Sequence, residues 1–188
     1  MGTLQSPKNL GGIGSVLVLI GAFIPYVGGA VAIAGLIFVL LAVKGLSDEL
    51  KDPVIFRNYL IAFLLSIVAV ILSAAIFVIF FLSTIFGSKT GSLGGWQVLI
   101  RLILAPLITI WIFSIVSAIF LRKSFTSIAE KTGIKMFRTT GTFYLLGALL
   151  IILLVGFILF LIAAILQILA FFSLPEQSQI QKFQDPSD

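Results

Sequence analysis

Side chains that could do chemistry are scarce in this chain of 188 residues. It contains no cysteine and no histidine, so it offers no thiolate and no imidazole base, and it lacks the ligands on which most zinc and haem sites depend. Its seven acidic residues all lie outside the long apolar runs, which argues against proton coupling through carboxylates. A serine within a run could attack a carbonyl only with a base beside it. We therefore expect no enzyme activity, no metal and no cofactor.

The serines inside the apolar runs have a simpler role in packing. Ser66 and Ser73 fall on one face of a helix, and Ser73 follows Ala69 by four positions. Ser114 and Ala118 repeat that spacing. Small residues four apart let two membrane helices approach closely, and hydroxyls can bond across the interface. We expect helix packing at these serines, with a polar permeation path as the alternative.

Glycines recur every seven residues near the start of the chain. They are Gly14, Gly21, Gly28 and Gly35. Within a helix a step of seven returns to nearly the same face, so these glycines form a flat strip on which another backbone can pack. We expect close helix packing along this strip.

Basic residues are the remaining candidates for a binding site. Arg101 lies five residues beyond Trp96, so it can extend to the outer interface as an anchor or contact a substrate or lipid phosphate. The bases Arg57, Arg122, Lys123 and Arg138 lie between apolar runs instead. They can attract anionic lipid headgroups, or they can serve only to set topology.

The elements that must position these residues are long and apolar. Hydrophobic residues make up 60% of the chain and the mean hydropathy is +1.25. Nearly uncharged runs cover residues 10–43, 59–86, 102–121 and 139–174. A hydrocarbon core of about 30 Å needs about 20 helical residues, so the sequence predicts an integral membrane protein. Its fold class is an all-α helical bundle with five membrane helices.

The helix boundaries follow from local signals. The first run is interrupted at Pro25 by a Pro-Tyr-Val-Gly-Gly stretch, which predicts a short hairpin of helices over 10–24 and 29–50 that either crosses the membrane twice or re-enters. Asp52-Pro53 predicts the start of a third helix. A fourth should begin at Trp96, pass Arg122 and stop at Gly133; the alternative starts a new helix at Ser127.

The last run is predicted to form a single helix over 139–174. The chain thus divides into a cytoplasmic N-terminal segment at 1–9, a membrane domain at 10–174 and a flexible polar tail at 175–188. Counting bases by side puts nine of the twelve on one face. Because cytoplasmic loops are rich in Lys and Arg, we expect a multipass protein of the cell membrane with its N-terminus in the cytoplasm and its tail outside. Bases that flank membrane spans also argue against nucleic-acid binding.

Three stretches resemble a known family. They are Leu-Gly-Gly-Ile-Gly-Ser at 10–15, Lys-Asp-Pro-Val-Ile-Phe at 51–56 and Met-Phe-Arg-Thr-Thr-Gly-Thr-Phe-Tyr-Leu-Leu-Gly at 136–147. In these the chain resembles an archaeal family of multipass membrane proteins of unknown function, domain of unknown function nine-nine-six. The resemblance covers nearly the whole chain. It implies a small multipass protein and supplies no activity, substrate or site residue.

These observations favour a non-enzymatic membrane protein that acts through helix and lipid contacts. It would work as an accessory subunit or as a homo-oligomer, with membrane lipids as further partners. The alternative is a small transporter or channel with a polar path lined by serines. The broken first hairpin, a helix kink expected at Pro106 and the faces that carry hydroxyls are features that recur in transport folds.

Overall fold

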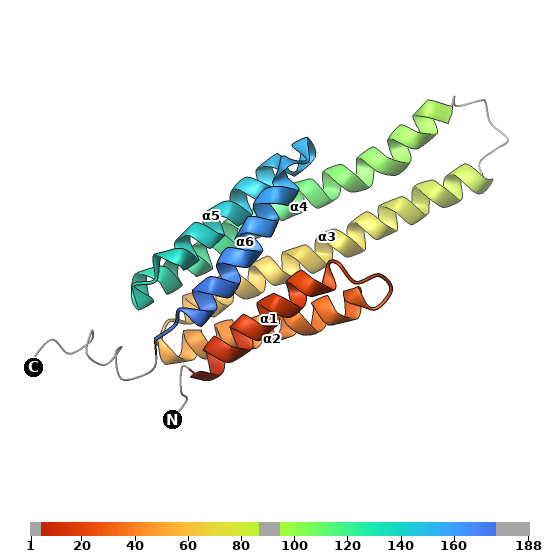
Figure 1. Cartoon of the computed structure of the whole chain (residues 1–188). Helices are drawn as coiled ribbons and strands as arrows, with labels where there is room; N and C mark the ends of the chain where they lie inside the picture. Colours follow the sequence, from red (N-terminus) through yellow and green to blue (C-terminus); the bar gives the residue numbers. More distant parts are fainter. Residues whose placement is uncertain (1–4, 87–94, 176–188) are drawn as a thin grey trace, which may run out of the picture.

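The computed structural model describes residues 5–86 and 95–175, and the elements in those ranges are helices without any strand. Figure 1 shows them in chain order. They are α1 (Gln5–Gly21), α2 (Gly28–Glu49), α3 (Pro53–Phe86), α4 (Gly95–Thr132), α5 (Lys135–Leu150), the short 3-10 turn η1 (Ile151–Leu153) and α6 (Val155–Phe172). The predicted all-α class is confirmed, and so is the short hairpin of α1 and α2.

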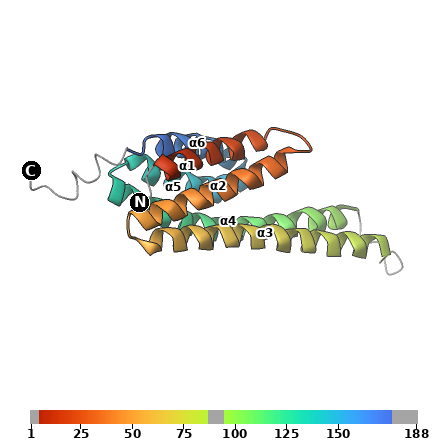
Figure 2. The ribbon, with the colours of Figure 1, turned by 90° about the horizontal axis from the view of Figure 1, so that it is seen from below.

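The helices pack as antiparallel neighbours, with α1 against α2, α3 against α4 and α5 against α6. The turns from α2 to α3 and from α4 to α5 lie at the same end of the molecule, which we call the base (Figure 1). At the opposite end α3 and α4 extend well beyond the other two hairpins (Figures 1 and 2). The four shorter helices therefore cover only the basal part of the long α3–α4 pair.

Two predicted helix boundaries are confirmed. Asp52 Oδ1 accepts a hydrogen bond from the Val54 backbone N–H at 3.0 Å, so Asp52 caps α3, which begins at Pro53. Gly133 has a φ of +73°, a backbone conformation that glycine adopts without a steric cost. Since α4 runs unbroken to Thr132, the alternative of a new helix at Ser127 is wrong.

The prediction of one helix over 139–174 is also wrong. The chain reverses after Leu150, and Leu154 has a φ of +60°, which is uncommon for a residue with a side chain. A Cβ built on Gly147 of α5 would lie 3.3 Å from the carbonyl oxygen of Gly156 in α6, so glycines allow the two helices to approach closely. The end of α6 consequently returns to the base, beside the start of α1 (Figure 1).

The best-packed part of the protein is at the base. Phe125, Phe137 and Phe171 are fully buried, and the rings pack in sequence with centroids 5.8 Å and 5.3 Å apart. The cluster around them draws on α2, α3, α4, α5 and α6. The hydrophobic effect stabilises such a core only where the unfolded chain would meet water. A core of this kind therefore fits a position at the edge of the membrane.

Towards the other end the apolar side chains face outwards. Ile71, Ile79 and Phe86 on α3 and Ile103 on α4 are all more than half exposed. Among the described residues, five helical segments are long and apolar enough to cross a membrane: Gly28–Glu49, Pro53–Phe86, Leu102–Thr132, Lys135–Leu153 and Val155–Phe172. An apolar exterior over such lengths fits lipid and not water, so the fold is that of a multipass membrane protein.

The tips of the two shorter hairpins are apolar as well. Phe23 and Tyr26 are exposed at the α1–α2 turn, and Leu153 and Leu154 are exposed at the α5–α6 turn. The backbone N–H of Gly28 bonds to the Ile24 carbonyl at 3.2 Å, and that of Leu154 bonds to the Ile151 carbonyl at 3.1 Å. These bonds satisfy part of the backbone of each turn, as lipid would require.

Candidate functional site

Serines fix the register between α3 and α4. Ser124 Oγ donates to the Ile55 carbonyl at 2.8 Å and Ser117 Oγ donates to the Ala62 carbonyl at 2.8 Å. Further from the base, Ser73 Oγ donates to the Pro106 carbonyl at 3.0 Å. From the first bonded pair to the second, both helices advance by seven residues, and from the second pair to the third, both advance by eleven. The register between α3 and α4 is therefore constant over this length. Counting from the Ile55–Ser124 pair in this register, Asn58 is level with Leu121, the last residue of the 102–121 apolar run.

A pocket of about 500 Å³ opens at this level, between α3, α4 and α5. Arg122 and Lys123 of α4, Arg138 of α5 and Asn58 of α3 line it. A Cβ built on Gly141 would lie 2.9 Å from Arg122 Cα, so the absence of a side chain at Gly141 lets α5 pack directly against α4. This packing brings Arg138 to the same pocket as Arg122.

Asn58 differs from the other polar residues of the pocket because it is only 9% exposed. No hydrogen bond joins its amide to another residue of the described ranges, although the side chain lines the pocket. Asn58 therefore has donors and an acceptor available to whatever enters the pocket.

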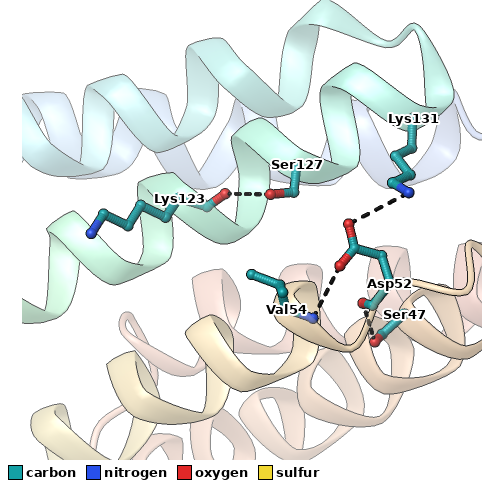
Figure 3. A network of polar contacts seen from close by, with 6 residues as sticks. All are labelled: Ser47, Asp52, Val54, Lys123, Ser127 and Lys131. Atoms are coloured by element: carbon teal, nitrogen blue, oxygen red, sulfur yellow. Dashed lines mark hydrogen bonds and ion pairs between the residues drawn. The ribbon is translucent and has the colours of Figure 1, made fainter.

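The charge of the pocket is positive. Among residues 5–86 and 95–175 no acidic side chain lines it, and Thr126 and Ser127 supply hydroxyls beside the three bases. Ser127 Oγ donates to the Lys123 carbonyl at 3.2 Å, as Figure 3 shows. The Lys123 ammonium lies 5.4 Å from the centre of the Phe120 ring. Guanidinium groups, an ammonium and hydroxyls are donors that suit phosphate or carboxylate oxygens.

An ion pair lies at the base next to this pocket. Lys131 Nζ lies 3.6 Å from Asp52 Oδ2, joining the end of α4 to the turn before α3 (Figure 3). Ser47 Oγ donates to the Asp52 carbonyl at 2.7 Å, which ties the end of α2 to the same turn. The carboxylate of Asp52 is thus occupied by Lys131 and by its own helix start, and it does not line the pocket.

The chain is similar to known proteins of one family. The family of proteins of unknown function called DUF996 matches residues 31–165 of this chain. This chain belongs to the DUF996 family. An uncharacterized protein of Methanocaldococcus jannaschii is similar to it, with 36% identity over 173 residues that cover 92% of this chain and 94% of the relative. No solved structure matches the chain significantly.

The part that matches DUF996 contains every residue named in the pocket. The resemblance to this family that was predicted from sequence is confirmed. DUF996 is described as a family of unknown function, so it supplies no activity for this chain. Among residues 5–86 and 95–175, no group of three or more acidic residues comes together in a way that could hold a metal ion. The pocket of this DUF996 protein is lined by bases, hydroxyls and an amide, which are groups that can donate hydrogen bonds.

The predicted glycine strip lies between α1 and α2. A Cβ on Gly14 would lie 2.7 Å from the Gly35 carbonyl oxygen, and a Cβ on Gly21 would lie 2.7 Å from that of Gly28. The glycines thus meet in antiparallel pairs, and the two backbones are close enough to exclude any side chain. This interface therefore serves close packing of α1 on α2.

The serines predicted for the α3–α4 interface are divided between two environments. Ser73 bonds across the interface, as described above. Ser66 and Ser114 line a second pocket of about 260 Å³, together with Ser117 and Tyr144. Both serines also donate within their own helices, Ser66 to Phe63 and Ser114 to Trp111.

Two predicted bases do not enter the basic pocket. Arg57 is exposed and does not line it. Arg101 is part of α4, and its side chain lies outside what the structure describes. Asn58, in contrast, was not among the predicted site residues. The signal that could have indicated it is an amide next to Arg57, at the start of the 59–86 apolar run.

Proposed function

We propose that this DUF996 protein is a non-enzymatic membrane protein that binds the anionic headgroups of surrounding lipids at its base. The observation that carries the proposal is the gathering of bases at that end of the bundle. They occupy the ends of α2 and α4, the starts of α3 and α5, and the turn between α2 and α3: Lys44, Lys51, Arg57, Arg122, Lys123, Lys131, Lys135 and Arg138. Each base near an anionic surface contributes about 1 kcal/mol of attraction.

The same bases support an orientation. Cytoplasmic loops are enriched in Lys and Arg, so we place the base at the cytoplasmic face of the cell membrane. Because α6 returns to the base, we place its end at Phe172 on the cytoplasmic side too. The sequence had predicted a single last helix that ends outside the cell, and our proposal differs from that prediction.

We further propose that the protein works as an accessory subunit, beside another membrane protein or a second copy of itself. The support is the long α3–α4 pair, which spans the membrane while the shorter hairpins cover only its basal part (Figures 1 and 2). Native mass spectrometry from mild detergent should then detect a complex. A partner-free monomer under all extraction conditions would contradict the accessory role.

Thermal unfolding tests lipid binding. The purified protein in a non-ionic detergent is heated with added phosphatidylglycerol or, separately, with phosphatidylcholine. A lipid that binds the folded state at about 100 times its Kd stabilises it by about 2.7 kcal/mol. We expect phosphatidylglycerol to raise the unfolding midpoint by several degrees more than phosphatidylcholine does. Equal shifts with the two lipids would contradict the proposal.

A transporter or channel is the second candidate, and the pocket beside Ser66 and Ser114 favours it. Four hydroxyls, those of Ser66, Ser114, Ser117 and Tyr144, reach this pocket between the α3–α4 pair and α5–α6. If the protein conducts a polar solute there, flux into proteoliposomes should exceed that of empty liposomes and fall when Ser66 and Ser114 are replaced by Ala. Flux equal to empty liposomes across a panel of solutes excludes this function.

A further inference from the structure

We propose that the pocket between α3, α4 and α5 is a built binding site for the phosphate group of an anionic lipid. This inference rests on the proposed function, and it assigns to specific residues what that function leaves to the general charge of the base. Three features carry it: the donor set, the unpaired amide of Asn58 among the described residues, and the depth of the pocket in the membrane.

The donor set matches a phosphate. Arg122 comes from α4 and Arg138 from α5, and both line the pocket. A guanidinium can donate two parallel hydrogen bonds to phosphate oxygens, and Lys123 adds a third positive charge. Because the described part of the chain brings no acidic side chain to the pocket lining, an anion there meets attraction without a competing carboxylate from that lining.

Asn58 provides evidence that is independent of charge. Asn58 is only 9% exposed, lines the pocket and has no hydrogen-bond partner among the described residues. Its amide atoms are reachable from the pocket, because the buried side-chain nitrogen left without a partner in those residues is Trp111 Nε1 and not an atom of Asn58. The amide can therefore take a partner from a bound molecule. The ester or hydroxyl oxygens that adjoin a lipid phosphate would supply one, since the amide can both donate and accept.

The depth of the pocket favours a lipid over free phosphate. Asn58 is level with Leu121, where the apolar run of α4 ends, and Arg122 and Lys123 follow immediately towards the base. The pocket lining is therefore graded, from Ile119 and Leu145 to the amide and then to hydroxyls and bases. This order matches the order of acyl chain, glycerol and phosphate in a phospholipid. A volume of about 500 Å³ is within the usual range for ligand pockets.

Titration calorimetry on the full chain in non-ionic detergent tests the site. The probes are short-chain phosphatidic acid, short-chain phosphatidylcholine and inorganic phosphate, each titrated separately. We expect phosphatidic acid to bind at least tenfold more tightly than either of the others. Inorganic phosphate that binds as tightly as phosphatidic acid would overturn the assignment to a lipid.

Two matched arginines separate the pocket from the general charge of the base. Arg138 and Arg57 are both exposed, and each lies in the first turns of a helix that starts at the base, but only Arg138 lines the pocket. Arg138→Gln should weaken phosphatidic acid binding about tenfold, equivalent to about 1.4 kcal/mol. Arg57→Gln removes the same charge and should weaken it less than twofold.

A variant that keeps the charge completes the test. Asn58→Leu should weaken phosphatidic acid binding several-fold although the net charge is unchanged. If Arg138→Gln and Arg57→Gln weaken binding equally and Asn58→Leu has no effect, the pocket assignment is overturned while lipid binding by the base stands. If the wild-type protein does not distinguish phosphatidic acid from phosphatidylcholine, the proposed function fails as well. Should Asn58→Leu not fold, the two arginine variants still decide the outcome.

Discussion

Gln167 Nε2 donates a hydrogen bond to Ser15 Oγ at 2.9 Å, joining α6 to α1 across 152 positions of sequence. Tyr144 of α5 donates to Gln167 Oε1 at 2.8 Å, and Ser15 donates in turn to the Gly11 carbonyl at 2.7 Å. Three helices are therefore linked by a continuous chain of hydrogen bonds. Gln167 and Ser15 are both buried, so each polar group depends on its neighbour in the chain.

Replacing Gln167 by Leu should lower the free energy of unfolding by about 1–2 kcal/mol, because hydrogen bonds between membrane helices contribute about 0.6 kcal/mol on average and up to about 1.7, and Tyr144 would lose its acceptor. The measurement is unfolding in detergent, followed by circular dichroism. Ser66→Ala is the control, since Ser66 bonds only within its own helix. Equal stability of the Gln167→Leu protein and the wild type would show that this series of hydrogen bonds does not stabilise the fold.

The glycine pairs of α1 and α2 predict a second contrast. Gly35→Ala introduces a Cβ that would lie 2.6 Å from the Gly14 carbonyl oxygen, whereas a Cβ on Gly29, in the same helix, meets nothing within 4 Å. Overpacking a tight interface costs about 1–3 kcal/mol, so Gly35→Ala should unfold at a clearly lower temperature. Gly29→Ala should be neutral or slightly stabilising, because Ala favours helix over Gly. Identical midpoints for the two variants would contradict the packing described here.

Asp52 predicts a third effect because its carboxylate has two roles (Figure 3). Asp52→Ala removes both the cap of α3 and the ion pair with Lys131, and a lost cap costs about 1 kcal/mol. Lys131→Ala removes only the ion pair, which should contribute less than about 1 kcal/mol for groups in partial contact with solvent. Thermal unfolding should therefore rank Asp52→Ala below Lys131→Ala, with Asp52→Asn close to Lys131→Ala because Asn also caps but cannot form the ion pair. A Lys131→Ala variant less stable than Asp52→Ala would reverse this assignment.

The α5–α6 tip predicts a fourth result, on membrane depth. Gly141 is level with Arg122, where the apolar run of α4 ends. Ten residues further along α5, Ile151 lies roughly 15 Å deeper, about half of a 30 Å hydrocarbon core. The native chain has no cysteine, so a single Leu154→Cys can be tested with a membrane-impermeant maleimide. We expect no labelling from either side, although Lys51→Cys at the base should label from the cytoplasmic side.

Labelling of Leu154→Cys from outside would mean that α5 and α6 cross the membrane completely. Tyr26→Cys applies the same test to the α1–α2 tip, for which the sequence allows either two crossings or re-entry. Lys51→Cys that labels only from outside would invert the proposed orientation of the whole bundle.

The sequence predicted those parts of the fold that depend on local chemistry. Asp52-Pro53 and Gly133 mark helix ends through their own backbone preferences, so their positions were correct. The reversal after Leu150 was missed because residues 143–155 contain no proline, charge or amide. It depends instead on Gly147 approaching Gly156, a contact between helices that periodicity does not reveal.

The candidate site was predicted only in part for a related reason. Sequence reasoning selected Arg122, Lys123 and Arg138 by charge, and the antiparallel packing of α4 on α5 places them around one pocket. It also selected Arg57, which lies outside the pocket, and passed over Asn58, which lines it. Which side of α3 faces α4 follows from hydrogen bonds such as that between Ser124 and Ile55, and these are visible only in the folded chain.

Lipid selection at the base is the central claim, and native mass spectrometry tests it most directly. The protein is reconstituted into nanodiscs that contain equal amounts of phosphatidylglycerol and phosphatidylcholine, released in the gas phase, and the lipids that stay bound are counted. Bound phosphatidylglycerol should clearly exceed bound phosphatidylcholine, and the excess should shrink with Arg138→Gln. A bound ratio equal to that of the nanodisc would contradict the account.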